Sequence, residues 1–167
     1  MLLEIIIVLL VVSCSLFIHE MGHAVATTVT VSKNSKAEVF MGSSSKAKKL
    51  RLSFGRITCY LTVAISGFCE YSIPKESTPF TYKQKLVFYL GGPIASLLCF
   101  VTLFIASHFV SGVAGNIIIN SAGANFFLFI TSLIPWTYPR FLGGLPSDGL
   151  QTLNLMKANR KERKFIT

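Results

Sequence analysis

Three long apolar runs without a lysine or arginine constrain this chain more than any other feature of its sequence. They cover residues 2–27, 86–110 and 113–135, and each exceeds the ~20 apolar residues that a helix needs to cross a bilayer. Only 14% of the residues are charged, against roughly 25% in an ordinary soluble domain. We therefore expect a membrane protein of mainly α class, with a three-transmembrane-helix core in a single domain spanning residues 1–167.

A cleavable signal peptide is the alternative reading of the first run, because Ala24-Val25-Ala26 is a small-residue sequence of the kind found at cleavage sites. Signal peptides normally begin with positive charge, however, and this run is preceded by neither a lysine nor an arginine. We therefore favour a transmembrane helix.

The basic residues are confined to two parts of the chain. All 16 Lys and Arg residues lie within residues 33–85 and 140–164, and such residues gather in the cytoplasmic loops of membrane proteins. We therefore expect the N-terminus outside the cell, and the 33–85 loop and the C-terminus in the cytoplasm. The net charge of +9 is expected to face the lipid bilayer, the nearest anionic neighbour, and no nucleic acid.

Apolar and polar residues alternate with period two between the first two runs. The alternation extends over Leu50–Phe54 and again over Ile57–Ile65, as in half-buried strands. We expect a small cytoplasmic β-sheet in the region 37–72, between transmembrane helices 1 and 2. A sheet edge within residues 50–66 is expected either to hold an extended substrate by strand addition or only to cover the site.

The first run ends in the motif His19-Glu20-Met21-Gly22-His23. On a helix the two histidines are about 40° apart around the axis and one turn apart along it, so both imidazoles can bind one metal ion. Glu20 lies on the adjoining flank, where its carboxylate can serve as the general base for water at a zinc ion. Ionisable residues in a transmembrane helix are costly and usually functional.

A catalytic zinc ion takes three protein ligands and leaves one position open. Asp148 is the acidic residue that follows a transmembrane run through a Pro- and Gly-rich stretch, residues 135–146. It also stands in an Asp-Gly segment, residues 147–157, where an aspartate is a good helix N-cap, so the residues alone leave ligand and cap open. Charge favours the ligand, because the Glu20 and Asp148 carboxylates would balance Zn2+ at membrane depth.

With these motifs the chain resembles the site-2 protease family of intramembrane zinc metalloproteases. The resemblance rests on the order of His19–His23, Gly91-Gly92-Pro93 in the second helix and Asp148-Gly149 after the third. It implies a zinc endopeptidase that cuts substrate proteins in or near their transmembrane segments. It also implies His19, His23 and Asp148 as zinc ligands and Glu20 as the catalytic acid/base.

Departures from the family pattern concern residues that would position the substrate. The family usually has an asparagine three residues before a proline in the third helix, and Ser132 stands there in this chain. Asn125, two turns earlier, is a possible substitute, and Ser96 stands near another usual asparagine. Gly92, four residues before Ser96, is also expected to permit close helix packing. We take Ser132, Asn125, Gly92 and Ser96 as candidate substrate-positioning residues.

Two alternatives to a protease are a catalytically inactive membrane zinc scaffold and an interaction protein with an accidental motif. A scaffold has no need of Glu20. The third histidine, His108, is expected at the outer end of the second helix, away from the metal. The four cysteines form no C-x-x-C pair and are expected to be reduced thiols.

Overall fold

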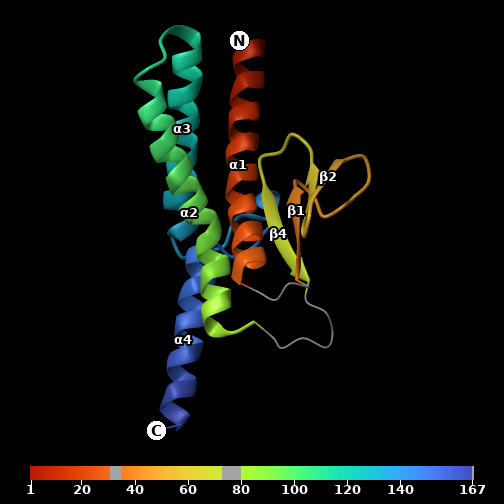
Figure 1. Ribbon diagram of the computed structural model, residues 1–167, viewed down its shortest axis with the longest axis vertical. Coiled ribbons are helices and arrows are strands. Elements are labelled where there is room, and N and C mark those ends of the chain that lie inside the picture. Colours follow the sequence, from red (N-terminus) through yellow and green to blue (C-terminus); the bar gives the residue numbers. More distant parts are fainter. Residues whose placement is uncertain (31–34, 73–79, 167) are drawn as a thin grey trace.

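The computed structural model describes residues 1–30, 35–72 and 80–166. Two lysines of the first basic segment, Lys33 and Lys75, fall outside these ranges. The long helices are α1 (Leu2–Thr30), α2 (Tyr82–Ser107), α3 (Gly112–Leu133) and α4 (Asp148–Ile166). Helices α1, α2 and α3 pack against one another, and α4 extends away from them toward the C-terminus (Figure 1).

The prediction of three helices long and apolar enough to cross a membrane is confirmed. Their limits differ from the apolar runs in places where local hydrogen bonding decides. Helix α2 begins at Tyr82 rather than near residue 86, because Thr81 and Gln84 form a reciprocal capping box. The polar capping residues Thr81 and Gln84 thus start α2 before the first residue of the apolar run.

Helices α1 and α2 approach closely near the predicted metal site. A side chain at Gly22 would overlap the carbonyl oxygen of Gly91, and one at Gly91 would lie 2.6 Å from the carbonyl oxygen of Gly22. Paired glycines of this kind let two helix backbones touch. The contact brings the second half of α1, with its histidines, against the first half of α2.

A four-stranded sheet lies beside α1, as expected for the region between the first two helices (Figure 1). Its strands are β1 (Lys36–Met41), β2 (Leu50–Phe54), β3 (Ile57–Leu61) and β4 (Gly67–Ser72). The spatial order is β2-β3-β1-β4, with β1 parallel to β3 and the other pairs antiparallel. The sheet packs on α1 through a cluster of small and apolar side chains that includes Ala24, Val39 and Cys59.

The strand predicted from the alternation over Ile57–Ile65 is too long. Strand β3 ends at Leu61, and Val63 and Ile65 are 60% and 54% exposed. The chain turns here because residues after the turn, from Gly67 on, pair with β1 instead. The backbone N–H of Ala64 in the turn donates a hydrogen bond to Ser13 Oγ (3.2 Å), which places the turn beside the middle of α1.

A short hairpin connects α3 to α4. The N–H of Tyr138 donates to the Leu145 carbonyl and the N–H of Ser147 donates to the Trp136 carbonyl, both at 2.9 Å. A single 3-10 turn, Arg140–Leu142, lies at the tip. The hairpin therefore returns the chain to the end of α3, and the predicted 147–157 segment begins there as the first turns of α4.

Candidate metal centre and active-site cavity

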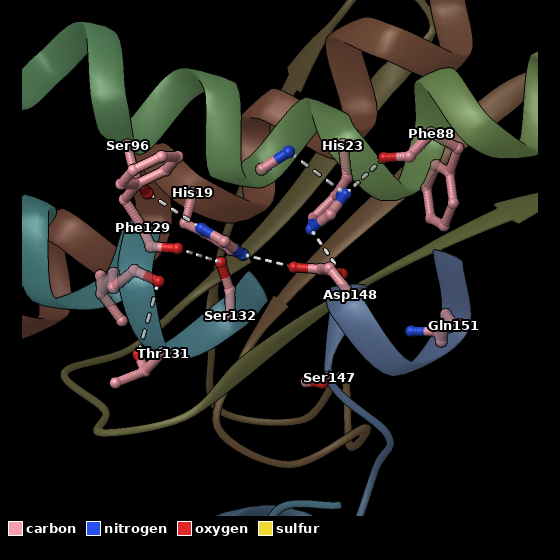
Figure 2. A network of polar contacts seen from close by, with 12 residues as sticks. His19, His23, Phe88, Ser96, Phe129, Thr131, Ser132, Ser147, Asp148 and Gln151 are labelled. Carbon is pink, nitrogen blue, oxygen red and sulfur yellow. Dashed lines mark hydrogen bonds and ion pairs between the residues drawn. The ribbon is translucent and has the colours of Figure 1, made fainter. Parts of the chain in front are cut away.

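Three predicted metal ligands from distant parts of the chain meet in the structure. His19 and His23 are buried on one face of α1, and Asp148 reaches them from the first residue of α4 (Figure 2). Asp148 Oδ2 lies 3.1 Å from His19 Nε2, and Asp148 Oδ1 lies 3.4 Å from His23 Nε2. One ligand atom from each of the three residues lies within 4.8 Å of the others.

These separations fit a zinc ion. Two ligands bonded to zinc at about 2.0–2.1 Å and set at a tetrahedral angle lie about 3.3 Å apart. The two His–Asp separations, 3.1 and 3.4 Å, fall on either side of that value. Two imidazoles and one carboxylate are also the donor set of known catalytic zinc sites, which keep a fourth position open.

Helix α2 fixes the orientation of both imidazole rings. His23 Nδ1 is 2.7 Å from the Phe88 carbonyl oxygen, and because a carbonyl only accepts, Nδ1 must carry the proton. His19 Nδ1 is 2.9 Å from Ser96 Oγ, a hydroxyl that can accept in the same way. These bonds direct both Nε2 atoms at Asp148, so that each Nε2 could give its lone pair to a bound metal, the orientation that second-shell partners produce in metal sites.

Gly92 lies directly over the two ligand nitrogens. A Cβ atom at this position would overlap His23 Nε2 and lie 2.6 Å from His19 Nε2. The absence of a side chain is therefore required by the site itself. The sequence analysis expected Gly92 to permit close helix packing, whereas its closest neighbours are the two imidazoles and the helix backbones touch at Gly22 and Gly91.

The choice between ligand and N-cap for Asp148 depends on the neighbouring serine. Ser147 Oγ accepts a hydrogen bond from the N–H of Leu150 (3.2 Å), so Ser147 caps α4. The same hydroxyl donates to the Ile134 carbonyl (2.6 Å), which joins the cap to the end of α3. With the cap supplied by Ser147, the Asp148 carboxylate is left free to face the histidines.

Asp148 is poised to be ionised at neutral pH. Burial by itself would raise its pKa, but His23 and His19 lower the pKa to about 2 by charge interaction and hydrogen bonding. A carboxylate must be ionised to bind a metal. The position of Asp148 therefore favours the form that a metal ligand requires.

Gly149 explains the second residue of the Asp-Gly motif. A side chain there would overlap the carbonyl oxygen of Leu133 at the end of α3. The start of α4 thus rests directly on α3. This contact fixes the distance between the start of α4 and α1, which the Asp148 side chain has to span to reach the histidines.

Glu20 is buried in the same centre and borders a cavity of about 820 Å3 that the three metal-ligand candidates also line. The walls come from α1, α3, β4 and the hairpin, and they are mainly apolar. Strand β4 approaches Glu20 so closely that a side chain at Gly67 would lie 3.2 Å from Glu20 Cγ. The carboxylate therefore lies between the metal-ligand cluster and a sheet edge.

The sheet edge at this cavity is β4, and of the predicted 50–66 region only its last residues, Ile65 and Ser66, line the cavity. Strand β3 is internal, and the other edge, β2, is separated from β4 by two strands. Residues Gly67, Phe68, Cys69 and Glu70 of β4 line the cavity. Period-two alternation identifies strands, but only the pairing of β1 with both β3 and β4 decides which strand is outermost.

The backbone of β4 has hydrogen-bonding groups directed at the cavity. The N–H of Gly42 donates to the Ser66 carbonyl, and in an antiparallel pair such bonded positions occur at every second residue. Phe68 is therefore a bonded position toward β1, whereas Gly67 and Cys69 direct their N–H and C=O groups to the open edge. That edge can accept another extended chain.

The remaining sequence candidates have different surroundings. Ser132 lines the cavity, but its hydroxyl donates to the Phe129 carbonyl (3.2 Å) within α3. Asn125 is buried and its amide donates to Ser15 Oγ on α1 (3.0 Å), which is a helix-packing contact. A substrate-positioning role for either residue stays a prediction.

Tyr138 and Gln151, which line the cavity, and Ser147, which supplies the cap, were not anticipated from the sequence. Ser96, predicted as a substrate-positioning candidate, contacts the metal-ligand candidate His19. The only sequence signal for Ser147 was its place directly before Asp-Gly. His108 lies at the end of α2 remote from this centre, bonded to the Phe104 carbonyl (2.8 Å).

Comparison with known proteins gives one match. The family model of Peptidase family M50 matches residues 7–164 of the 167-residue chain. No curated protein and no solved structure matches the chain. The matched region contains α1 from its second turn, the sheet, α2, α3 and most of α4, and so the whole site described above. The chain belongs to Peptidase family M50, the site-2 protease family, whose members are membrane metalloproteases.

Proposed function

We propose that this protein is an intramembrane zinc endopeptidase, with His19, His23 and Asp148 as zinc ligands and Glu20 as general base. One observation carries the proposal. Ligand atoms from residues more than a hundred positions apart in the sequence lie within 4.8 Å of one another, and a buried glutamate opens onto the same cavity. An inactive zinc scaffold would give no reason for a buried carboxylate beside the ligands.

The proposed mechanism assigns each proton to an atom of this chain. Bound zinc would supply a Lewis acid that lowers the pKa of a coordinated water and polarises the scissile carbonyl. Glu20 takes a proton from the attacking water and returns it to the leaving amine. His19 and His23 keep their Nδ1 protons, held by Ser96 and Phe88. Asp148 remains ionised throughout.

The substrate is proposed to lie extended between β4 and α3. The apolar cavity walls suit a transmembrane segment, and the open backbone groups of Gly67 and Cys69 can pair with it by strand addition. A helical substrate must unwind locally first, because its carbonyls are otherwise engaged in helix hydrogen bonds. Pairing with β4 would compensate for part of the lost hydrogen bonding.

We also propose the orientation expected from the positive-inside rule. The N-terminus lies outside, and the sheet and C-terminal helix are reached from the cytoplasm. Residues 157–164 of α4 carry Lys157, Arg160, Lys161, Arg163 and Lys164 and would lie next to anionic headgroups. Cysteine-accessibility labelling of Ser45→Cys and Leu2→Cys in intact cells and in lysed cells measures this orientation.

The central test compares wild-type protein with Glu20→Gln in cells. Glu20→Gln is expected to keep its zinc and to lose proteolysis by at least about 10²-fold, because the proton acceptor is gone. Quantitative proteomics then detects membrane proteins that accumulate uncut. Glu4→Gln is the matched control, since Glu4 lies on the same helix at its exposed start. Equal fragment levels from wild type and Glu20→Gln, with zinc bound in both, would favour the scaffold.

A further inference from the structure

A hydrogen-bond donor at the carbonyl oxygen accelerates peptide hydrolysis beyond what a base and a Lewis acid supply. Negative charge develops on that oxygen, and a preorganised neutral donor stabilises it. The polar side chains that the sequence suggested in α3 are otherwise engaged. The Ser132 hydroxyl donates to Phe129 (3.2 Å), and the Asn125 amide donates to Ser15 (3.0 Å) and the Ser121 carbonyl (2.9 Å).

A tyrosine from the α3–α4 hairpin lies in the same cavity. Tyr138 lines it together with Glu20 and Asp148. Its backbone N–H donates to the Leu145 carbonyl (2.9 Å), and one step along the hairpin Ser147 is bonded to Trp136 (2.9 Å). Because Asp148 follows Ser147 directly, the same rigid hairpin positions the phenol and the third metal-ligand candidate.

The phenol shares the cavity with both site carboxylates. Burial, and then the charges of Asp148 and Glu20, raise the pKa of Tyr138 to about 12, while the Trp136 indole acts in the opposite direction. The hydroxyl therefore keeps its proton at neutral pH and can donate a hydrogen bond into the cavity. The Trp136 ring, 5.3 Å away between centroids, limits the positions open to the phenol.

From this placement we propose that the Tyr138 hydroxyl donates a hydrogen bond to the carbonyl oxygen of the scissile peptide. The bond strengthens as negative charge develops on that oxygen, and the Tyr138 proton is not transferred. The proton for the leaving amine comes from Glu20, so the proton balance of the reaction is unchanged. This inference rests on the proposed peptidase function and adds a donor to it.

The test uses the full chain, zinc-loaded and reconstituted in liposomes. The probe is a quenched fluorescent peptide with a leucine- and alanine-rich transmembrane segment interrupted by a Gly-Ser pair. Tyr138→Phe is expected to lower kcat by about 10²-fold, the effect of removing one donor to a developing oxyanion, with KM and zinc content unchanged. Tyr82→Phe, at the start of α2, is the matched control and is expected to keep the wild-type kcat.

A second measurement separates stabilisation of charge from packing. A leucyl phosphonamidate peptide presents an anionic oxygen where the charged carbonyl oxygen would lie, so Tyr138→Phe is expected to weaken its binding by the same factor as kcat. A wild-type kcat in Tyr138→Phe, unchanged phosphonamidate affinity, or loss of zinc along with activity would overturn the proposal and leave the peptidase function standing. A zinc-loaded wild-type protein that cleaves nothing would overturn the peptidase function itself.

Discussion

Replacing Gly92 with alanine would place a methyl group on the two nitrogens that are proposed to hold zinc. The new Cβ would lie 2.6 Å from His19 Nε2 and 2.8 Å from His23 Cδ2, whereas ordinary contact begins at 3.4 Å. The His19 ring would have to move by about 0.8 Å, and the His23 ring, whose Nε2 the methyl group overlaps, would have to move farther. They cannot easily do so, because Ser96 and the Phe88 carbonyl hold them from the other side.

The size of the effect follows from the tolerance of metal sites. Zinc–ligand distances in proteins stay within about 0.2 Å of their usual values, so a shift four times larger should break at least one bond. Loss of a single second-shell partner lowers metal affinity about 10–100-fold. We therefore expect Gly92→Ala to weaken zinc binding by at least about 100-fold, measured by competition with a chromophoric chelator in detergent.

Two glycine controls separate the metal site from the fold. Gly123→Ala adds a methyl group with nothing within 4 Å and should bind zinc like the wild type. Gly22→Ala overlaps the Gly91 backbone and should lower thermal stability, while its folded fraction still binds zinc. If Gly92→Ala folds and binds zinc as tightly as Gly123→Ala, the two imidazoles do not share an ion in the arrangement described here.

Two further substitutions probe the supports of the ligands. Ser96→Ala is expected to lower zinc affinity about 10-fold, because His19 loses the partner that orients its ring. Ser96→Thr keeps a hydroxyl and should bind zinc more tightly than Ser96→Ala. Equal zinc affinity of these two variants would argue against this reason. Gly149→Ala is expected to lower both zinc affinity and melting temperature, because its methyl group overlaps the Leu133 carbonyl and displaces Asp148. The same chelator competition measures the zinc affinity, and a thermal melt measures the melting temperature. If neither changed in Gly149→Ala, this expectation would be contradicted.

The sequence could predict those features that depend on residues near one another in the chain. Helix length and apolar composition alone predict the three spans, since a bilayer core admits few alternatives to an apolar helix. The four-residue spacing of His19 and His23 places both rings on one face of any helix that contains them. The need for a glycine beside the imidazoles at position 92 was not predicted, because it depends on how α2 packs against α1.

The tertiary structure decided the features that depend on distant pairings. Alternation in residues 50–66 marks a strand equally well at an edge or in the centre, and only the pairing of β1 with both β3 and β4 puts β4 at the cavity. Likewise, an aspartate at a helix start is as good a cap as a ligand. The Leu150 N–H donates to Ser147 Oγ, which supplies the cap, so Asp148 is not needed as the cap.

The sequence by itself therefore determined the membrane helices and the histidine pair, because both follow from the period and length of a single helix. Only the tertiary structure brought Asp148 and Ser96 to those histidines and Tyr138 into the same cavity, because all three come from segments far from α1 in the sequence. Their approach depends on glycine contacts between helices and on the path of the α3–α4 hairpin. Packing between such remote segments leaves no periodic signal in the chain.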